Sequence, residues 1–224
     1  PKDFPRARVV YNSQATETKT RGAVTNSFTR QEESKIFITP QELAAEKGEN
    51  SLVNSKTLLI VCDISRPSMV VDQKLLDRVD KVFVIDHHRR TDEFIEQPLF
   101  DYIDTTASST CEMVAEMIYY GNTPEYTLDS KYATLMLAGI YLDTNYFRTN
   151  TTGARTFLAS MILEEYGADV TLADEFLKDE FEEYALITKI MNSLETVSLG
   201  ITVAHADDSD IVDSATLAKV AINQ

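Results

Sequence analysis

Two short apolar runs, at residues 57–63 and 81–86, dominate the hydrophobic pattern of the chain, and each ends in an acid. Runs of this length without polar alternation are typical of parallel strands covered on both faces. Between them, Leu75, Leu76 and Val79 predict a short helix. A strand, a crossover and a second strand form a right-handed parallel unit, so we expect Asp63 and Asp86 to meet at one edge of a sheet.

Weaker patterns flank this unit. Short strands are predicted at residues 7–11, 35–38 and 200–205, and the polar stretch 15–33 indicates an exposed helix or a loop. A helix is predicted to begin at Pro40, directly after the capping residue Thr39. Further helices are predicted at 111–120, 128–143 and 214–222, with two solvated helices between 169 and 194. The predicted core positions of the helix at 128–143 are Leu135, Leu137, Ile140 and Leu142. The fold class is α/β with a parallel sheet.

Composition narrows the choice of partners. The 224 residues carry a formal net charge of −15, which argues against duplex nucleic acid as the main partner. A small anionic substrate remains compatible, because metal ions and local arginines can reverse the sign of one pocket. Cys62 and Cys111 are predicted to be reduced thiols. No apolar run approaches the ~18 residues of a membrane helix, and no signal peptide is evident. Because the chain starts without methionine, we interpret it as a piece of a longer protein.

Acids and histidines end the buried elements at a spacing that predicts a metal site. The candidates are Asp63, Asp86, His87 and Asp143. Oxygen ligands with one imidazole suit Mn²⁺ or Mg²⁺, and the lack of a cysteine argues against structural zinc. Alternatively, Asp63 and Asp143 are ordinary acids at the ends of a strand and a helix. If the strand conformation continues beyond Asp86, His88 points away from His87 and contacts the substrate or supports the ligands.

Several polar residues near these acids are candidates for binding phosphate. Guanidinium groups fit phosphate oxygens, and backbone amides at the start of a helix bind anions. Each group also has a purely structural interpretation, as solvated surface charge, an N-terminal loop or a helix cap. The candidates are Arg89 and Arg90 after the second strand, Ser108 and Ser109 before a helix, and Arg148 and Arg155 around the turn at 151–153.

The segment 84–90, Val-Ile-Asp-His-His-Arg-Arg, resembles the DHH phosphoesterase family, which is named for this triplet. The resemblance extends over residues 35–168 and includes the segments 59–63, 107–110, 137–144 and 152–157. The Asp-His-His-Arg-Arg form with the Ala-Ser-Ser-Thr loop is most similar to the branch of membrane-anchored bacterial cyclic di-AMP phosphodiesterases.

The resemblance implies a two-metal phosphodiesterase with Mn²⁺ as cofactor. Asp63 would bridge two ions, and His87 and Asp143 would ligate one of them. Asp86 would orient the cluster, and His88 would lie beside the phosphate. The implied reaction opens cyclic di-AMP to linear pApA. The implied domains are a DHH domain at 1–168, linker helices at 169–197 and the start of a DHH-associated substrate domain at 198–224.

The chain departs from the family pattern in three places. The first motif, HxxxDxD, is absent, and so is the later GGGH loop. The usual Asp-Thr-His or Asp-Thr-Asn reads Asp63-Ile64-Ser65, which predicts the loss of one polar group that supports the site. We therefore expect the isolated chain to bind Mn²⁺ weakly and to turn over little.

Other functions stay open on the sequence alone. One alternative is a related DHH activity, namely nanoRNA or pAp hydrolysis or inorganic pyrophosphatase. Another is a non-catalytic binding or oligomerisation module that has lost its metals. The expected partners are a cyclic dinucleotide and a second copy of the chain in a homodimer. The expected parent protein is anchored at the cytoplasmic face of the membrane, whereas this chain is expected to be soluble.

Overall fold

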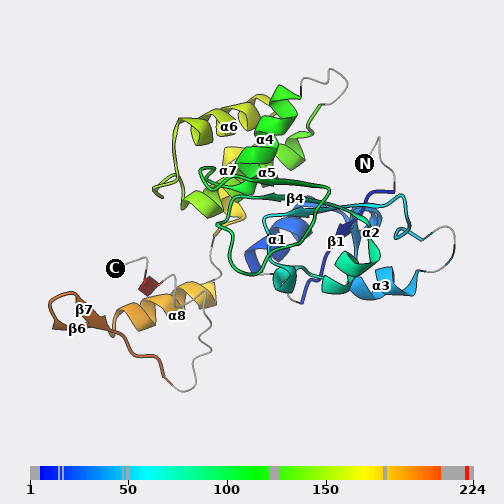
Figure 1. The fold of residues 1–224 in the computed structure, drawn as a ribbon. Coiled ribbons are helices and arrows are strands. Elements are labelled where there is room, and N and C mark those ends of the chain that lie inside the picture. Colours follow the sequence, from blue (N-terminus) through cyan, green and yellow to red (C-terminus); the bar gives the residue numbers. More distant parts are fainter. Residues whose placement is uncertain are drawn as a thin grey trace. The chain divides into compact units, whose positions relative to one another are not determined.

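The computed structural model describes residues 6–14, 16, 18–46, 48, 51–121, 127–178, 181–207 and 220–221. The chain forms two compact units, Pro1–Leu177 and Lys178–Gln224. The first unit is mixed α/β, as the sequence predicted, and it contains every candidate site residue (Figure 1).

A three-stranded parallel sheet lies at the centre of the first unit. Its strands are β3 (Leu58–Cys62), β4 (Lys81–Asp86) and β5 (Phe100–Ile103), in the order β3-β4-β5. The middle strand β4 is buried on both faces, which explains its unbroken apolar run. Val84 packs with Val61 on one face, and Ile85 packs with Met113 on the other. The crossover from β3 to β4 contains 3₁₀ turns, η1 (Pro67–Met69) and η2 (Gln73–Arg78), in place of the predicted helix.

A second, two-stranded parallel sheet pairs β1 (Val9–Val10) with β2 (Phe37–Ile38). The polar stretch between them forms two helices, α1 (Thr18–Ser27) and α2 (Arg30–Ile36), so the predicted strand at 35–38 is shorter than expected. Helix α3 (Pro40–Ala45) begins where the sequence predicted. Thr39 and Glu42 form a capping box there, with the Thr39 hydroxyl accepting from the Glu42 amide at 3.2 Å.

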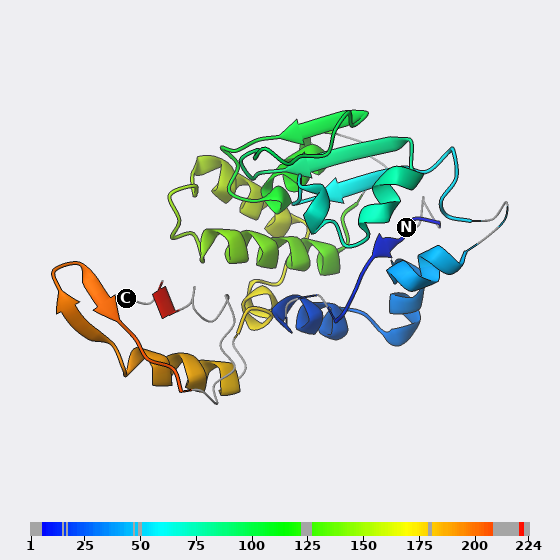
Figure 2. The ribbon, with the colours of Figure 1, turned by 60° about the horizontal axis from the view of Figure 1, so that its bottom comes forward.

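Four helices complete the first unit and lie beside the three-stranded sheet (Figures 1 and 2). They are α4 (Thr110–Tyr120), α5 (Ser130–Thr144), α6 (Ala154–Glu165) and α7 (Val170–Glu175). Leu137 and Ile140 of α5 are buried in their shared core, as predicted, together with Leu163 of α6. The expectation for Leu142 is wrong, because its side chain is 46% exposed.

The second unit contains α8 (Phe181–Met191) and an antiparallel hairpin of β6 (Glu195–Ser198) and β7 (Ile201–Val203). Sequence patterns predicted the strand at 200–205 but missed β6. The helix predicted at 214–222 lies almost entirely outside the described residues. Within that range the structure describes only residues 220 and 221, and both are helical. The predicted domain boundaries at 168 and 197 therefore stay predictions. Among the described helices, none is long and apolar enough to span a membrane.

Candidate metal centre

The predicted metal residues lie at the carboxyl edge of the three-stranded sheet, where ligands collect in parallel α/β folds. Asp63 directly follows β3, Asp86 is the last residue of β4, and His87 comes next. The parallel register pairs Cys62 with Ile85, and the Asp63 amide donates to the Ile85 carbonyl at 2.8 Å. The βαβ unit therefore brings the two acidic strand ends together, as the sequence predicted.

His87 lies between two carboxylates that come from different elements. Its Nε2 atom is 3.4 Å from Asp63 Oδ1 and 3.8 Å from Asp143 Oδ2. Asp143 is the penultimate residue of α5, so the third predicted ligand comes from the helical layer. Within the described part of the chain, His87 Nε2 is buried without a hydrogen-bond partner. A buried ring nitrogen that faces two carboxylate oxygens in this way is the geometry that a metal ion would satisfy.

Charge at this edge also favours a cation. Burial, and then repulsion from Asp63, raises the pKa of Asp143 to about 6, although His87 acts in the opposite direction. Two carboxylates that are held close together and partly shielded from water repel each other. A divalent ion between them would neutralise this repulsion. Carboxylate oxygens combined with imidazole nitrogen suit Mn²⁺ or a similar first-row ion.

His88 lies on the same side as His87, which corrects the expectation that it points away. The strand ends at Asp86, and the two imidazole rings then lie against each other with their centroids 4.3 Å apart. His88 Nδ1 lies 2.7 Å from Asp86 Oδ1, and the His88 amide donates to the same oxygen at 3.1 Å. Potential ligand atoms of Asp63, His87 and His88 all lie within 4.8 Å of one another. His88 is thus a fourth residue able to reach an ion at this edge.

Asp86 is 1% exposed, and its carboxylate contacts the His88 ring from the buried side of the site. Burial alone would raise the pKa of Asp86, but interactions with Ser65 and His88 outweigh it and lower the pKa. The Asp86 carboxylate therefore stays ionised and holds the His88 ring through Nδ1. Ser65 belongs to the segment 63–65, in which the sequence predicted the loss of one polar group, and its buried side chain interacts with Asp86.

Thr110 is a site residue that the sequence did not single out. Its hydroxyl donates to Asp63 Oδ1 at 2.8 Å, across a separation of 47 residues. Asp63 has a left-handed backbone with φ of 66°, which is unusual for a residue with a side chain. The only signal in the sequence was the position of Thr110 in the Ala-Ser-Ser-Thr loop, where it reads as part of a helix start.

The chain turns sharply after Asp143. Asn145, Tyr146 and Phe147 have φ values of 44°, 57° and 66°, three consecutive left-handed residues without a glycine. Conformations of this kind cost about 1–3 kcal/mol each and persist only where the surroundings enforce them. Here the Tyr146 and Phe147 rings pack against Tyr141, with centroids 5.4 and 5.3 Å away. This strained turn leads directly to Arg148.

The predicted phosphate-binding residues divide into exposed and buried groups. Arg89, Arg90 and Arg148 are exposed, and Arg90 pairs with Asp101. Ser108 and Ser109 are 1% and 0% exposed, and both bond to Glu112. Ser109 caps α4 by accepting from the Glu112 amide at 3.0 Å. A substrate contact for any of these residues stays a prediction.

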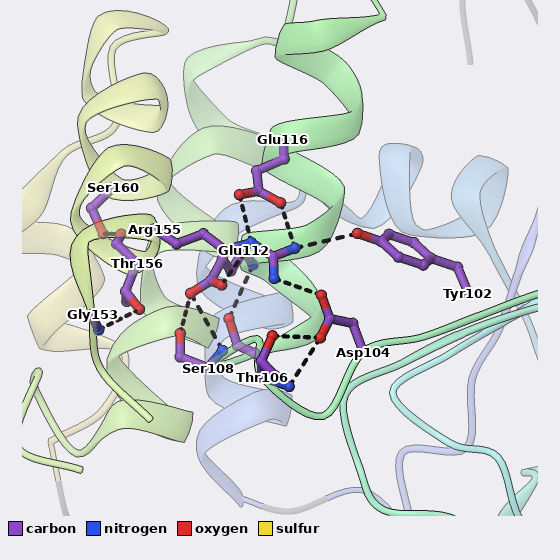
Figure 3. Close-up of polar contacts among 11 residues, drawn as sticks. Tyr102, Asp104, Thr106, Ser108, Glu112, Glu116, Gly153, Arg155, Thr156 and Ser160 are labelled. Atoms are coloured by element: carbon purple, nitrogen blue, oxygen red, sulfur yellow. Dashed lines mark hydrogen bonds and ion pairs between the residues drawn. The ribbon is translucent and has the colours of Figure 1, made fainter. Parts of the chain in front are cut away.

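Arg155 is surrounded by acids (Figure 3). Its Nε and Nη2 atoms donate to the Glu116 carboxylate, both at 2.7 Å, and Nη1 donates to Asp104 Oδ2 at 2.6 Å. A further contact joins Nε to Glu112 Oε1 at 3.4 Å. These hydrogen bonds, with Glu116 first, raise the pKa of Arg155. The predicted substrate contact of Arg155 also stays a prediction.

A family model described as "DHH family, N-terminal domain" matches residues 7–140. The chain belongs to the DHH family. Among its relatives, the Cyclic-di-AMP phosphodiesterase GdpP of Geobacillus thermodenitrificans is 40% identical over 170 residues, covering 76% of this chain and 26% of that protein. The Cyclic-di-AMP phosphodiesterase PdeA of Listeria monocytogenes is 39% identical over 177 residues, covering 78% of this chain and 26% of that protein. The chain thus spans about a quarter of the length of these relatives.

A more distant relative is the Bifunctional oligoribonuclease and PAP phosphatase NrnA of Bacillus subtilis, 33% identical over 109 residues, which cover 49% of this chain and 34% of that protein. The fold is similar to the crystal structure of an exopolyphosphatase-related protein from Bacteroides fragilis, with a TM-score of 0.54, 15% identity, and coverage of 74% of this chain and 54% of that one. At this identity the likeness supports the α/β fold alone.

Proposed function

We propose that this DHH domain is part of a metal-dependent phosphodiesterase that hydrolyses cyclic di-AMP to linear pApA with two Mn²⁺ ions. The observation that carries the proposal is the buried His87 Nε2 between Asp63 and Asp143, which has no hydrogen-bond partner among the residues that the structure describes. The substrate assignment draws its support from the two relatives at 39–40% identity, both named cyclic-di-AMP phosphodiesterases. The whole protein's activity belongs to a chain longer than the part matched here.

Each side chain has a defined task in this proposal. Asp63, His87 and Asp143 would hold the metal, which when bound would supply positive charge at the phosphate and activate a water at neutral pH. His88 is held by Asp86 through Nδ1, and in its imidazolium form it would donate from Nε2 to a phosphate oxygen. The exposed Arg89 and Arg148 provide cations for the second phosphate.

The reaction balances with water as the only co-substrate. The water oxygen bonds to phosphorus, the bond from phosphorus to the 3′-oxygen breaks, and that oxygen leaves with a proton. The product keeps a 5′-phosphate and one intact phosphodiester bond. The substrate, cyclic di-AMP, is a dianion. The strongly acidic chain as a whole would repel it, so local cations at this edge of the sheet are necessary for binding.

The direct test is chromatography of cyclic di-AMP incubated with the chain and Mn²⁺. We expect slow formation of pApA that requires Mn²⁺ and is abolished in His87→Gln. The matched control is Asp92→Asn, which removes an exposed acid outside the cluster and is expected to keep the wild-type rate. Equal rates in wild type and His87→Gln, or no product and no Mn²⁺ binding in the wild type, would contradict the proposal.

A second candidate is the activity named for the NrnA relative, hydrolysis of short oligoribonucleotides or pAp. The same assay separates the candidates when linear pApA, pAp and pyrophosphate are supplied in parallel. Faster release of AMP from pApA or pAp than opening of cyclic di-AMP would favour this second function. A chain that binds Mn²⁺ but hydrolyses none of these substrates would favour a binding module.

A further inference from the structure

Arg155 bonds to both ends of the segment 104–116, which runs from the end of β5 into the middle of α4. At the first end, Nη1 donates to Asp104, whose other oxygen accepts from the Thr106 amide at 2.9 Å and the Thr106 hydroxyl at 2.7 Å. At the second end, Nε and Nη2 form a two-pronged contact with Glu116 of α4. Figure 3 shows the guanidinium lying between these acids. One side chain of α6 thus sets the distance between the start of the loop and the body of the helix.

The segment between these anchors has a tightly bonded shape. Glu112 is 1% exposed, and its Oε2 atom accepts from both the hydroxyl and the amide of Ser108. Ser109 caps the helix through the Glu112 amide. Glu112 Oε1 also lies 3.4 Å from Arg155 Nε, so the same guanidinium is the cation next to this buried carboxyl group. The first turn of α4 therefore depends on Arg155 for both its position and its charge balance.

Thr110 is the residue at which this segment reaches the candidate metal centre. It is 5% exposed and donates to Asp63 Oδ1, the oxygen that lies 3.4 Å from His87 Nε2. The Asp63 side chain is 50% exposed. A half-exposed carboxylate on a left-handed residue has few packing contacts to select its rotamer, so the Thr110 hydroxyl has a large influence on where it points.

We propose that Arg155 is a positioning residue for the metal centre: by clamping Asp104 and Glu116, it places Thr110 so that the threonine hydroxyl orients Asp63. This role differs from the substrate contact predicted for Arg155 from the sequence, which stays a prediction. It rests on the proposed function only in that Asp63 is taken as a metal ligand. Lysine would preserve the charge but not the planar fork that serves two carboxylates at once.

The experiment compares wild type, Thr110→Val, Arg155→Lys and the double variant by two measurements. The first, on the metal-free chain, is the NMR resonance of the Thr110 hydroxyl proton, which is buried and hydrogen-bonded and so exchanges slowly. The second is Mn²⁺ affinity from the electron paramagnetic resonance of free Mn²⁺. Changes in groups that support metal ligands typically cost about 10–100-fold in affinity. We expect roughly tenfold weaker Mn²⁺ binding in each single variant.

The double variant identifies the route of the effect. If Arg155 acts through Thr110, the double variant binds Mn²⁺ no more weakly than Thr110→Val alone. We also expect Arg155→Lys to shift or abolish the hydroxyl resonance. The matched control is Lys131→Gln, which breaks the ion pair to Glu32, 2.8 Å long, at the far end of α5. It is expected to alter stability while leaving both measurements unchanged.

Several outcomes would overturn the proposal. They are a wild type without a protected Thr110 hydroxyl, an Arg155→Lys chain whose hydroxyl resonance is unchanged, and losses of affinity that multiply in the double variant. If Arg155→Lys fails to fold, Glu116→Gln weakens the same clamp from the other side and is judged by the same criteria. If the wild type binds no Mn²⁺ but Arg155→Lys still removes the hydroxyl resonance, the positioning role stands and the proposed metal function falls.

Discussion

Replacing Asp143 with asparagine should stabilise the metal-free chain at neutral pH. The Asp143 side chain is 28% exposed, and its carboxylate lies 3.8 Å from His87 Nε2 and is repelled by Asp63. Burial and the Asp63 charge raise its pKa from 3.8 to about 6. At neutral pH the folded chain must therefore keep this carboxylate ionised in surroundings that disfavour its charge. Asparagine has nearly the same shape without that charge.

The size and sign of the effect follow from the pKa. The rise from 3.8 to about 6 is roughly two units, each worth about 1.4 kcal/mol, so the penalty is at most about 3 kcal/mol. Because the raised pKa means that the folded state holds the proton more tightly, the penalty is absent below the unfolded pKa, grows between about pH 4 and pH 6, and is complete above that range. Allowing for the new amide, we expect a gain of about 1–2 kcal/mol for Asp143→Asn at pH 7.5.

Urea unfolding followed by circular dichroism, with a chelator present, measures this difference. The advantage of Asp143→Asn should shrink towards zero at pH 4, and Asp92→Asn, which changes an exposed acid, should show no such trend. Added Mn²⁺ should reverse the order, because metal stabilises the chain that binds it more tightly. An asparagine variant that is less stable than wild type at pH 7.5 without metal, or a gain that does not depend on pH, would refute the reasoning.

Three further outcomes test other parts of the fold. Hydrogen bonds from Thr106, and then the Arg155 guanidinium, lower the pKa of Asp104 from 3.8 to about 2, so the stability that Asp104 adds relative to Asp104→Asn should be complete above about pH 4 and vanish as the pH falls to about 2 in urea titrations. Thr39→Ala should cost about 1 kcal/mol by the same method, whereas Thr39→Ser keeps the cap. Gly139→Ala places a methyl group 2.5 Å from Cys111 Sγ, so it should lower stability by about 1–3 kcal/mol and be rescued by Cys111→Ala.

Each of these three predictions has a clear contrary result. An Asp104 contribution that persists at pH 2 would mean that its carboxylate is not held in the ionised form. Equal losses in Thr39→Ala and Thr39→Ser would mean that the hydroxyl does not cap α3. Additive effects of the Gly139 and Cys111 substitutions would mean that the two residues do not limit how closely α4 and α5 approach.

The local sequence pattern was sufficient to predict those features of this protein that depend on residues close together in the chain. Strand β4 is a continuous apolar run, because a central parallel strand needs apolar side chains on both faces. The run in β3 also predicted a strand correctly, but the expectation that it is covered on both faces is wrong, because β3 lies at an edge of the sheet with Leu58 and Ile60 exposed. The start of α3 is specified by the four residues of a capping box. The meeting of Asp63 with Asp86 follows from the parallel direction of the two strands that a crossover connects. The Asp-His-His triplet identified the family for the same reason, since its residues are contiguous.

Contacts between distant elements were decided by the tertiary structure. The strand β5 was missed because it is only four residues long and the exposed Asp101 interrupts its apolar run. The orientation of His88 depends on the backbone conformation after β4 ends at Asp86, which the hydrophobic pattern does not specify. The roles of Thr110 and Arg155 depend on the packing of α4 and α6, because each side chain meets partners about 40 or more residues away. The sequence by itself therefore determined which acids and histidines come together, whereas only the packed helices decided how they are held.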